Sequence, residues 1–108
     1  MKASISVKDY KNAGEYKDAI RKNVREIRER FPDAKVYIQK GNRGTNFIAF
    51  GKELERTSIY YHNYENKEEF EKAISKAISK LFRKYSKSFI NKERLRNRID
   101  LVAYEKFL

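Results

Sequence analysis

Cationic side chains are the residues of this chain that are best placed to bind a charged ligand. Residues 80–98, KLFRKYSKSFINKERLRNR, hold eight Lys or Arg and a single acid, Glu93. The whole chain of 108 residues has 26 Lys or Arg against 15 Asp or Glu, a formal net charge of +11, so this stretch carries most of the excess. A charge that far from zero favours an anionic partner, and nucleic acid is the commonest such partner of a basic domain.

A helix that runs past residue 80 would align several of these cations. At 100° per residue, five basic side chains span about 80° of arc opposite the apolar face: Lys72, Lys76, Lys80, Arg83 and Lys87. Glu68 is spaced to pair with Lys72, but Lys76, Lys80 and Lys87 have no acid three or four residues away. An ordinary solvated helix face alternates its charges, and this one does not. We therefore expect a surface that binds phosphates, with the solvated face as the alternative.

Two further groups of cations add to this expectation. In the helix predicted for residues 15–31, four basic side chains fall within about 80° of arc: Lys17, Arg21, Arg25 and Arg28. Their guanidinium forks suit phosphate oxygens, and salt bridges with neighbouring acids are the alternative. In KERLRNR, residues 92–98, Arg94 and Arg98 would share a helical face. The predicted nucleic-acid-binding residues are Lys76, Lys80, Arg83, Lys84, Lys87, Arg94, Arg96, Arg98, Arg21, Arg25, Arg28 and Arg43.

The last of these residues, Arg43, lies in GNRG, residues 41–44. Glycine and Asn tolerate the positive φ that tight hairpins need, so a plain turn is the simpler explanation. Arg43 at its tip could still contact a nucleic-acid backbone. A phosphate-binding glycine loop requires a following helix, and a strand is predicted here instead.

The aromatic cluster IYYHNY, residues 59–64, contains the only His of the chain. Aromatic rings beside cations can stack on nucleic-acid bases. Strand alternation, however, would bury Ile59 and Tyr61 and expose Tyr60 and His62, so core packing is the favoured interpretation.

Catalytic chemistry has little support in the sequence. One His and no Cys exclude a Cys nucleophile and a His-rich metal site. A metal-dependent nuclease needs clustered carboxylates, for which the candidates are Asp9 with Glu15, and Glu53 with Glu55. Glu15 is explained more simply as an acid at a helix start. We expect no enzymatic activity, no metal and no cofactor.

Hydrophobic periodicity predicts the elements that would position these residues. Alternation predicts a strand within residues 2–8, and a three-and-four spacing predicts a helix over 15–31 that ends before Pro32. Short aromatic and β-branched segments joined by glycine turns predict three strands: 35–40, 45–52 and 57–62. Asn66 and Glu69 have the spacing of a capping box and begin a second helix, with an apolar face from Phe70 to Tyr85.

After residue 88 the pattern is ambiguous. Residues 88–91 could cap a third helix that continues to about residue 98, while 99–105 could be helix or strand. The resulting fold class is α+β, with an antiparallel sheet of three to five short strands covered by two or three amphipathic helices. Its order is β-α-β-β-β-α, then helix or strand. We see no internal repeat and no linker, so one compact domain of residues 1–108 is expected.

The order helix, three strands, helix in residues 15–87 is similar to that of double-stranded-RNA-binding domains. The resemblance is one of topology and covers about two thirds of the chain. It would imply phosphate contacts from Lys residues at the start of the last helix. Here that start is Asn66-Lys67-Glu68-Glu69, which bears acids, and the cations come one to four turns later.

Two functions of different class follow from these features. The first is a small basic module that binds DNA or RNA, mainly by phosphate contacts from residues 76–98. The second is an inhibitor or adaptor of the phage or mobile-element type, such as an anti-CRISPR-like protein, that docks on an acidic enzyme or a nucleoprotein complex. Base specificity and oligomeric state stay open. No signal peptide or long apolar run is present, so we expect a cytoplasmic protein without membrane contact.

Overall fold

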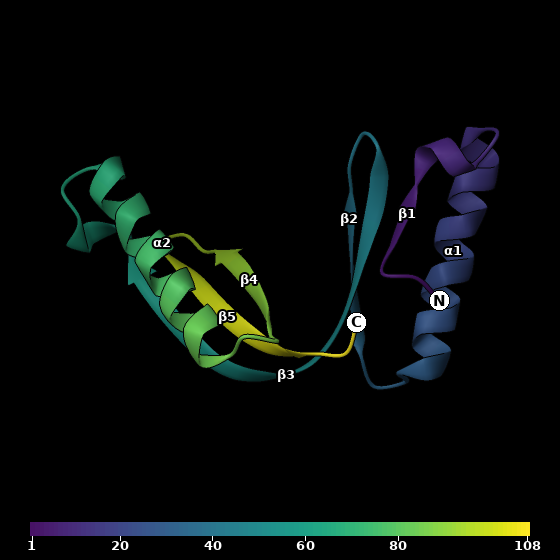
Figure 1. The fold of residues 1–108 in the computed structure, drawn as a ribbon. Coiled ribbons are helices and arrows are strands. Elements are labelled where there is room, and N and C mark those ends of the chain that lie inside the picture. The colour runs from purple at the N-terminus through teal and green to yellow at the C-terminus, as the bar shows by residue number, and fades with distance from the viewer. The chain divides into compact units, whose positions relative to one another are not determined.

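A computed structural model describes all 108 residues of the chain. The chain forms two helices and five strands (Figure 1). These are β1 (Ser4–Ser6), α1 (Ala13–Arg30), β2 (Lys35–Lys40), β3 (Gly44–Tyr60), α2 (Lys67–Lys84), β4 (Phe89–Arg94) and β5 (Arg98–Lys106). The strands form one antiparallel sheet in the order β1-β3-β5-β4, with β2 also paired to β3. The predicted α+β class is therefore confirmed. Neither helix is long and apolar enough to cross a membrane.

The chain divides into two compact units. The first unit comprises Met1–Gly51 and Lys106–Leu108, and the second unit comprises Lys52–Glu105. Strand β3 runs through both, so its first part belongs to the first unit and its second part to the second. Each unit has one helix and its own hydrophobic core.

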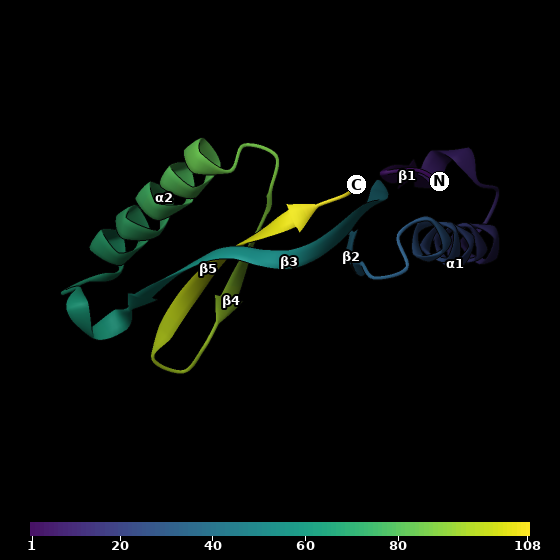
Figure 2. The ribbon, with the colours of Figure 1, turned by 90° about the horizontal axis from the view of Figure 1, so that it is seen from below.

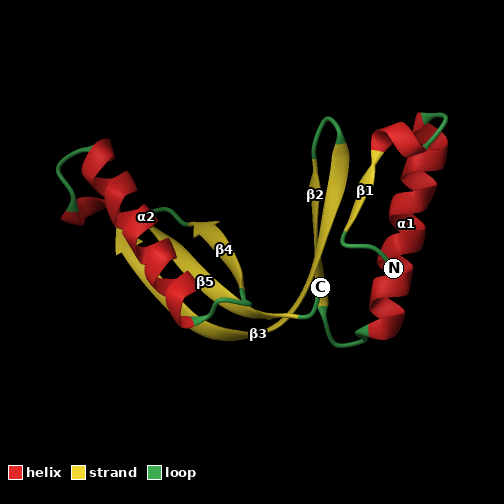
Figure 3. Cartoon of the chain, viewed as in Figure 1, coloured by secondary structure: helices red, strands yellow, loops and turns green.

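In the first unit, β3 is the middle strand and α1 lies beside the sheet (Figures 1 and 3). Thr45 of β3 pairs with Ile5 of β1 and with Lys40 of β2. The core brings together apolar residues of α1, β1 and β3: Ile5, Ile20, Ile27, Phe47 and Ala49. The end of the chain adds to this unit, because the Phe107 amide donates to the Ala49 carbonyl at 2.8 Å and Leu108 packs on the core.

In the second unit, β5 pairs with both β3 and β4. Strands β4 and β5 form a hairpin (Figure 2) in which Phe89 lies opposite Tyr104 and Arg94 opposite Ile99. Helix α2 contributes the apolar stripe Phe70, Ile74 and Leu81 to the core. The remaining core residues come from β3 and β5: Ile59, Ile99, Leu101 and Ala103.

The start of α2 and the end of α1 lie where the sequence predicts. The Asn66 side chain accepts a hydrogen bond from the Glu69 amide at 2.9 Å, which confirms the predicted cap of α2. Asn12 caps α1 by the same contact with the Glu15 amide, also at 2.9 Å. Helix α1 ends with Phe31 as its C-cap, directly before Pro32, because Pro disfavours helical backbone in the residue before it.

The two halves of the chain are copies of one pattern, so the expectation of no internal repeat was wrong. Each element of the first half recurs in the second at a constant offset in residue number: α1 and α2 begin at Ala13 and Lys67, β2 and β4 at Lys35 and Phe89, and β3 and β5 at Gly44 and Arg98. We call residues 1–54 the first repeat and 55–108 the second repeat. Without any gap, they are identical at 11 positions: 4, 5, 10, 12, 15, 19, 20, 22, 49, 52 and 54 of the first.

Backbone hydrogen bonds recur with the same offset. The Val7 amide donates to the Arg43 carbonyl at 2.9 Å, and at the equivalent positions of the second repeat the Tyr61 amide donates to the Asn97 carbonyl at 3.2 Å. The bond that closes the β2–β3 turn, from the Gly41 amide to the Gly44 carbonyl, has its counterpart in the β4–β5 turn. Contacts between side chains do not force these matches, because most side chains differ. The repeat is therefore a property of the backbone fold.

Two predictions of secondary structure were wrong: the division of residues 45–62 into two strands, and the third helix after residue 88. Residues 45–52 and 57–62 are not separate strands: β3 continues from Gly44 to Tyr60, because Gly51 stays extended and no residue adopts a positive φ. The third helix predicted after residue 88 is a strand, since Phe89 and Ile90 pair across to β5. The order between the two helices is therefore two strands, and the topology that suggested a double-stranded-RNA-binding domain is absent.

The predicted turn at residues 41–44 is confirmed, but not its stated cause. No residue there has a positive φ. Gly44 is instead required by a close approach of β1: a Cβ on Gly44 would lie 2.5 Å from the Ile5 carbonyl oxygen, which is far inside van der Waals contact. Arg43 lies at this turn and is exposed.

Candidate nucleic-acid interface

The outer face of α2 carries a row of cations without partners. Lys76, Lys80 and Arg83 are exposed, and none of them forms a hydrogen bond or an ion pair, whereas Lys72 lies 3.7 Å from Glu68. We call Lys76, Lys80 and Arg83 the α2 ridge. Lys80 interacts with the charge of Glu55, but no acid holds these three cations in an ion pair, so they are available to an external anion.

Lys87 was expected to continue this row on the helix, and that placement was wrong. Helix α2 ends at Lys84, with Tyr85 as its C-cap, and Lys87 lies in the turn that leads to β4. The helix stops there because the chain must reverse to place Phe89 and Ile90 in the sheet. Lys87 is nevertheless exposed and without an ion pair, so it follows the α2 ridge in sequence as one more free cation.

Lys84, in contrast, is held by the protein itself. Its Nζ lies 2.7 Å from Oε1 of Glu55 and 5.4 Å from the centre of the Tyr85 ring. The hydrogen bond with Glu55 raises the pKa of Lys84, and the same bond lowers the pKa of Glu55 against the opposing effect of partial burial. Lys84 is thus the predicted helix cation with the strongest internal partner, which makes it a poorer phosphate ligand.

Arg94 and Arg98 do not share a helical face as predicted, because they lie on the two strands of the β4–β5 hairpin. Arg98 Nε donates to Oδ1 of Asp100 at 3.0 Å, and its guanidinium lies 5.7 Å from the centre of the Tyr60 ring. Asp100 is almost fully buried, with a side chain 1% exposed. Arg98 is thereby fixed to the sheet, whereas Arg94 is exposed and unpaired.

Asp100 is the centre of an ion-pair network that sequence reasoning missed. Its carboxylate accepts hydrogen bonds from Ser58 Oγ and from Arg56 Nη1, each at 2.7 Å. The bond from Ser58, with those from Arg56 and Arg98, lowers the pKa of Asp100 although burial acts in the opposite direction. Ser58 and Arg56 are far from Asp100 along the chain, and no local pattern connects them.

Two of the four acids that were candidate metal ligands, Glu53 and Glu55, have cationic partners. Arg56 also lies 2.8 Å from Glu53 and 3.3 Å from Glu93, and Glu55 pairs with Lys84. Glu93 in turn accepts a hydrogen bond from the Tyr104 hydroxyl at 2.7 Å. Burial, followed by this contact, raises the pKa of Tyr104 to about 12. Glu53 and Glu55 are therefore structural partners of cations.

The α1 arginines are brought together as predicted, along one groove between α1 and β2. Arg21, Arg25 and Arg28 line it with apolar residues that include Ile20 and Ile38. Arg21 also lies 3.2 Å from Asp18, but both side chains are largely exposed, so water competes strongly with this pair. Arg43 and Arg96 lie at the turns of the β2–β3 and β4–β5 hairpins, each in its own unit.

Tyr61 was expected in the core and is 41% exposed instead. Strand β3 ends at Tyr60, and residues Tyr61–Asn63 form a short 3-10 helix that breaks the alternation. His62 is exposed and Ile59 is buried, as predicted, whereas Tyr60, which was expected to be exposed, is partly buried. One aromatic ring is thus left at the surface beside the cations of β4.

No known protein family, no curated protein and no solved structure matches the chain. The useful comparison is therefore the one between its own repeats. The positions of Lys80, Arg83 and Lys87 correspond to Glu26, Glu29 and Asp33, on the equivalent helix and the turn after it. Because the same backbone carries acids at these positions in the first unit, the fold itself does not require cations there.

Proposed function

We propose that this protein binds nucleic acid through the phosphate backbone, with the α2 ridge and Lys87 as the principal contacts. One observation carries the proposal: these cations form no hydrogen bond or ion pair within the protein, and most replace acids of the equivalent positions in the first repeat. Unpaired cations on one helix face repel one another, and that cost is removed when phosphates lie over them.

The unpaired arginines outside α2 support the same function. Arg94 lies on the edge strand β4 and Arg96 at the turn after it, and both are exposed. Arg25, Arg28 and Arg43 of the first unit are exposed as well. Such side chains would add phosphate contacts, while Lys84 and Arg98, which are held by Glu55 and Asp100, would contribute less.

The test replaces ridge cations by the residues of the first repeat. The variant Lys80→Glu, Arg83→Glu, Lys87→Asp should keep its fold, since Glu26, Glu29 and Asp33 occupy these positions in the first unit. We expect its affinity for labelled DNA or RNA, measured by fluorescence anisotropy at about 100 mM salt, to fall at least about 100-fold, because each charge-assisted contact contributes about 1 kcal/mol or more. Circular dichroism checks the fold.

A matched control separates the ridge from net charge. The variant Lys8→Glu, Lys35→Glu, Lys52→Glu removes the same charge from exposed lysines elsewhere, and it should lose much less affinity. Equal losses in the two variants would show that only net charge matters. Unchanged affinity in the ridge variant would remove α2 from the site, and absence of any binding by the unchanged protein would contradict the proposal and point to an acidic protein partner.

A further inference from the structure

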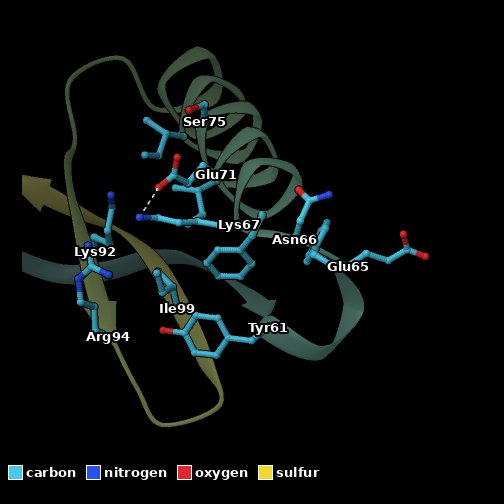
Figure 4. A pocket seen from close by; sticks show the side chains of 13 residues that line it. Tyr61, Glu65, Asn66, Lys67, Glu71, Ser75, Lys92, Arg94 and Ile99 are labelled. Atoms are coloured by element: carbon cyan, nitrogen blue, oxygen red, sulfur yellow. Dashed lines mark ion pairs between the residues drawn. The ribbon is translucent and has the colours of Figure 1, made fainter.

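A groove in the second unit combines features that the α2 ridge lacks. It lies between α2 and the edge strand β4, with a volume of about 610 Å³. Its lining includes aromatic, aliphatic and cationic side chains (Figure 4): Tyr61, Tyr64, Phe70, Ile74, Lys92 and Arg94. The α2 ridge occupies the outer face of the same helix, and none of its residues lines the groove.

Tyr61 lines this groove with an aromatic ring that is partly exposed to solvent. Its ring centre lies 4.8 Å from that of Phe70 with an angle of 33° between the rings, and Tyr64 packs edge-on against Phe70 at 5.6 Å. Phe70 is buried, whereas Tyr61 is 41% exposed. A ring that is supported on one side and open on the other offers a flat apolar surface to a second flat ring.

Two unpaired cations lie on the opposite wall. Lys92 and Arg94 project from β4 on the α2 side of the sheet, and Figure 4 shows the Tyr61 hydroxyl pointing toward the strand that carries them. Lys67 also lines the groove, but it lies 3.9 Å from Glu71, and Glu65 points away from the cavity (Figure 4). The anion-binding part of the groove is therefore the β4 side.

The first repeat shows that this combination is not imposed by the fold. The equivalent groove between α1 and β2 has Ile38 in place of Lys92. Val7 occupies the position of Tyr61, and the Tyr16 ring at the position of Phe70 uses its hydroxyl in a hydrogen bond with Thr45. The exposed ring and the facing pair of cations occur together only in the second repeat.

We propose that the α2–β4 groove holds one unpaired nucleotide of a single strand, with its base against Tyr61 and its phosphate at Lys92 and Arg94. The assignment rests on the proposed nucleic-acid binding and deepens it, because a base buried in a duplex cannot reach the ring. Charge and shape both fit: the occupant must be flat, apolar on its faces and anionic close to the ring, and stacking on an aromatic side chain is how single strands are held without base reading.

Adenosine monophosphate tests the groove independently of the ridge, because one base and one phosphate are too small to span both. Titration followed by NMR should shift the signals of Tyr61, Phe70 and Arg94. The variant Tyr61→Val, which introduces the residue of the first repeat, should weaken this binding about tenfold. Lys92→Ile, also taken from the first repeat, should weaken it as well, while the ridge variant should bind the nucleotide normally.

Oligonucleotides then connect the groove with the proposed function. Tyr61→Val should lose about tenfold in affinity for a single-stranded oligothymidine and keep its affinity for a duplex of equal length. No nucleotide-induced shift at millimolar concentrations, or the same shift in Tyr61→Val, would overturn the groove assignment while leaving the ridge result untouched. Nucleotide binding in the groove by a protein that binds no oligonucleotide would refute the proposed function and reduce the groove to a site for free nucleotides.

Discussion

The two repeats hold the same backbone with opposite charges at two equivalent positions of their helices. Helix α1 has Glu26 and Glu29 where α2 has Lys80 and Arg83, yet both helices are 18 residues long and have the same cap. The cores agree instead: Ile20 corresponds to Ile74, Ile27 to Leu81 and Phe47 to Leu101, and all six are buried. The fold thus constrains the inner face and leaves the outer face open to specialisation.

Buried polar groups differ as well. The second unit buries Asp100 among Arg56, Arg98 and Ser58, whereas the equivalent of Asp100 in the first unit is the exposed Asn46. A buried charge requires partners, and the second repeat supplies Arg56 and Arg98 where the first has Lys2 and Gly44. The buried acid and its arginines therefore occur as a set, in one repeat alone.

Exchange of the charges between repeats should have the largest effect. The variant carries Lys80→Glu, Arg83→Glu and Lys87→Asp together with Glu26→Lys, Glu29→Arg and Asp33→Lys, so its net charge is unchanged. Contacts with α2 should disappear and contacts with α1 should appear, because position on the scaffold decides which cations are free. Cross-linking to a labelled strand measures this shift. Cross-links that stay on α2 would contradict the comparison.

Loss of Asp100 should cause the largest change in stability. Asp100→Asn leaves Arg56 and Arg98 without their buried partner, and removing one member of a buried pair is strongly destabilising. The midpoint of urea unfolding should fall, and hydrogen exchange should speed up mainly in the second unit. The matched control, Asn46→Ala in the first repeat, changes an exposed side chain and should leave the midpoint nearly unchanged. A large fall of the urea midpoint in both variants would contradict the claim that only position 100, and not position 46, holds a stabilising buried network.

Low pH should reduce the unfolding free energy of the protein through the same carboxylate, that of Asp100. The pKa of Asp100 is lowered in the folded state, so the stability it contributes is present above the pKa of the unfolded chain, about 3.9. This contribution is lost as the pH falls below that value toward the folded pKa. The free energy of unfolding of Asp100→Asn should therefore depend less on pH in this range than that of the unchanged protein. Parallel pH profiles would rule out the assignment.

The helix caps should have smaller and equal effects. Asn12→Ala and Asn66→Ala each remove one hydrogen bond to the amide of the third helical residue, and each should cost about 1 kcal/mol of unfolding free energy. Urea titration measures both. Clearly unequal losses of unfolding free energy would show that the two caps do not stabilise their helices to the same extent.

The sequence predicted what depends on neighbours along the chain. The caps at Asn66 and before Pro32, and the apolar stripes of both helices, follow from spacings of three and four residues, and the structure contains them. Strand β4 was missed, and residues 99–105 were left open between helix and strand, because Leu95, Ile99 and Val102 imitate a helical period by chance. Only pairing across the turn shows that Arg94 faces Ile99.

The repeat was missed because its 11 identities are scattered over the whole length of each half, and several other core positions, such as Ile27 and Leu81, hold different apolar residues. Alignment of the turn GNRG with LRNR, residues 95–98, would have predicted the second hairpin. The cationic α2 ridge could be predicted from helical spacing, whereas the contacts of Lys84 with Glu55 and of Arg98 with the Tyr60 ring could not. Glu55 and Tyr60 both lie on β3. In the sequence, Glu55 precedes Lys84 by the whole length of α2, and Tyr60 is separated from Arg98 by α2 and β4.

The salt dependence of binding tests the central claim most directly. Each phosphate neutralised by a cation adds about 0.9 to the slope of log affinity against log salt concentration for duplex DNA. The variant Lys80→Glu, Arg83→Glu, Lys87→Asp should therefore show a slope shallower by about 2 to 3 than the unchanged protein, while Lys8→Glu, Lys35→Glu, Lys52→Glu should retain most of it. Equal slopes for the unchanged protein and the ridge variant would contradict the account.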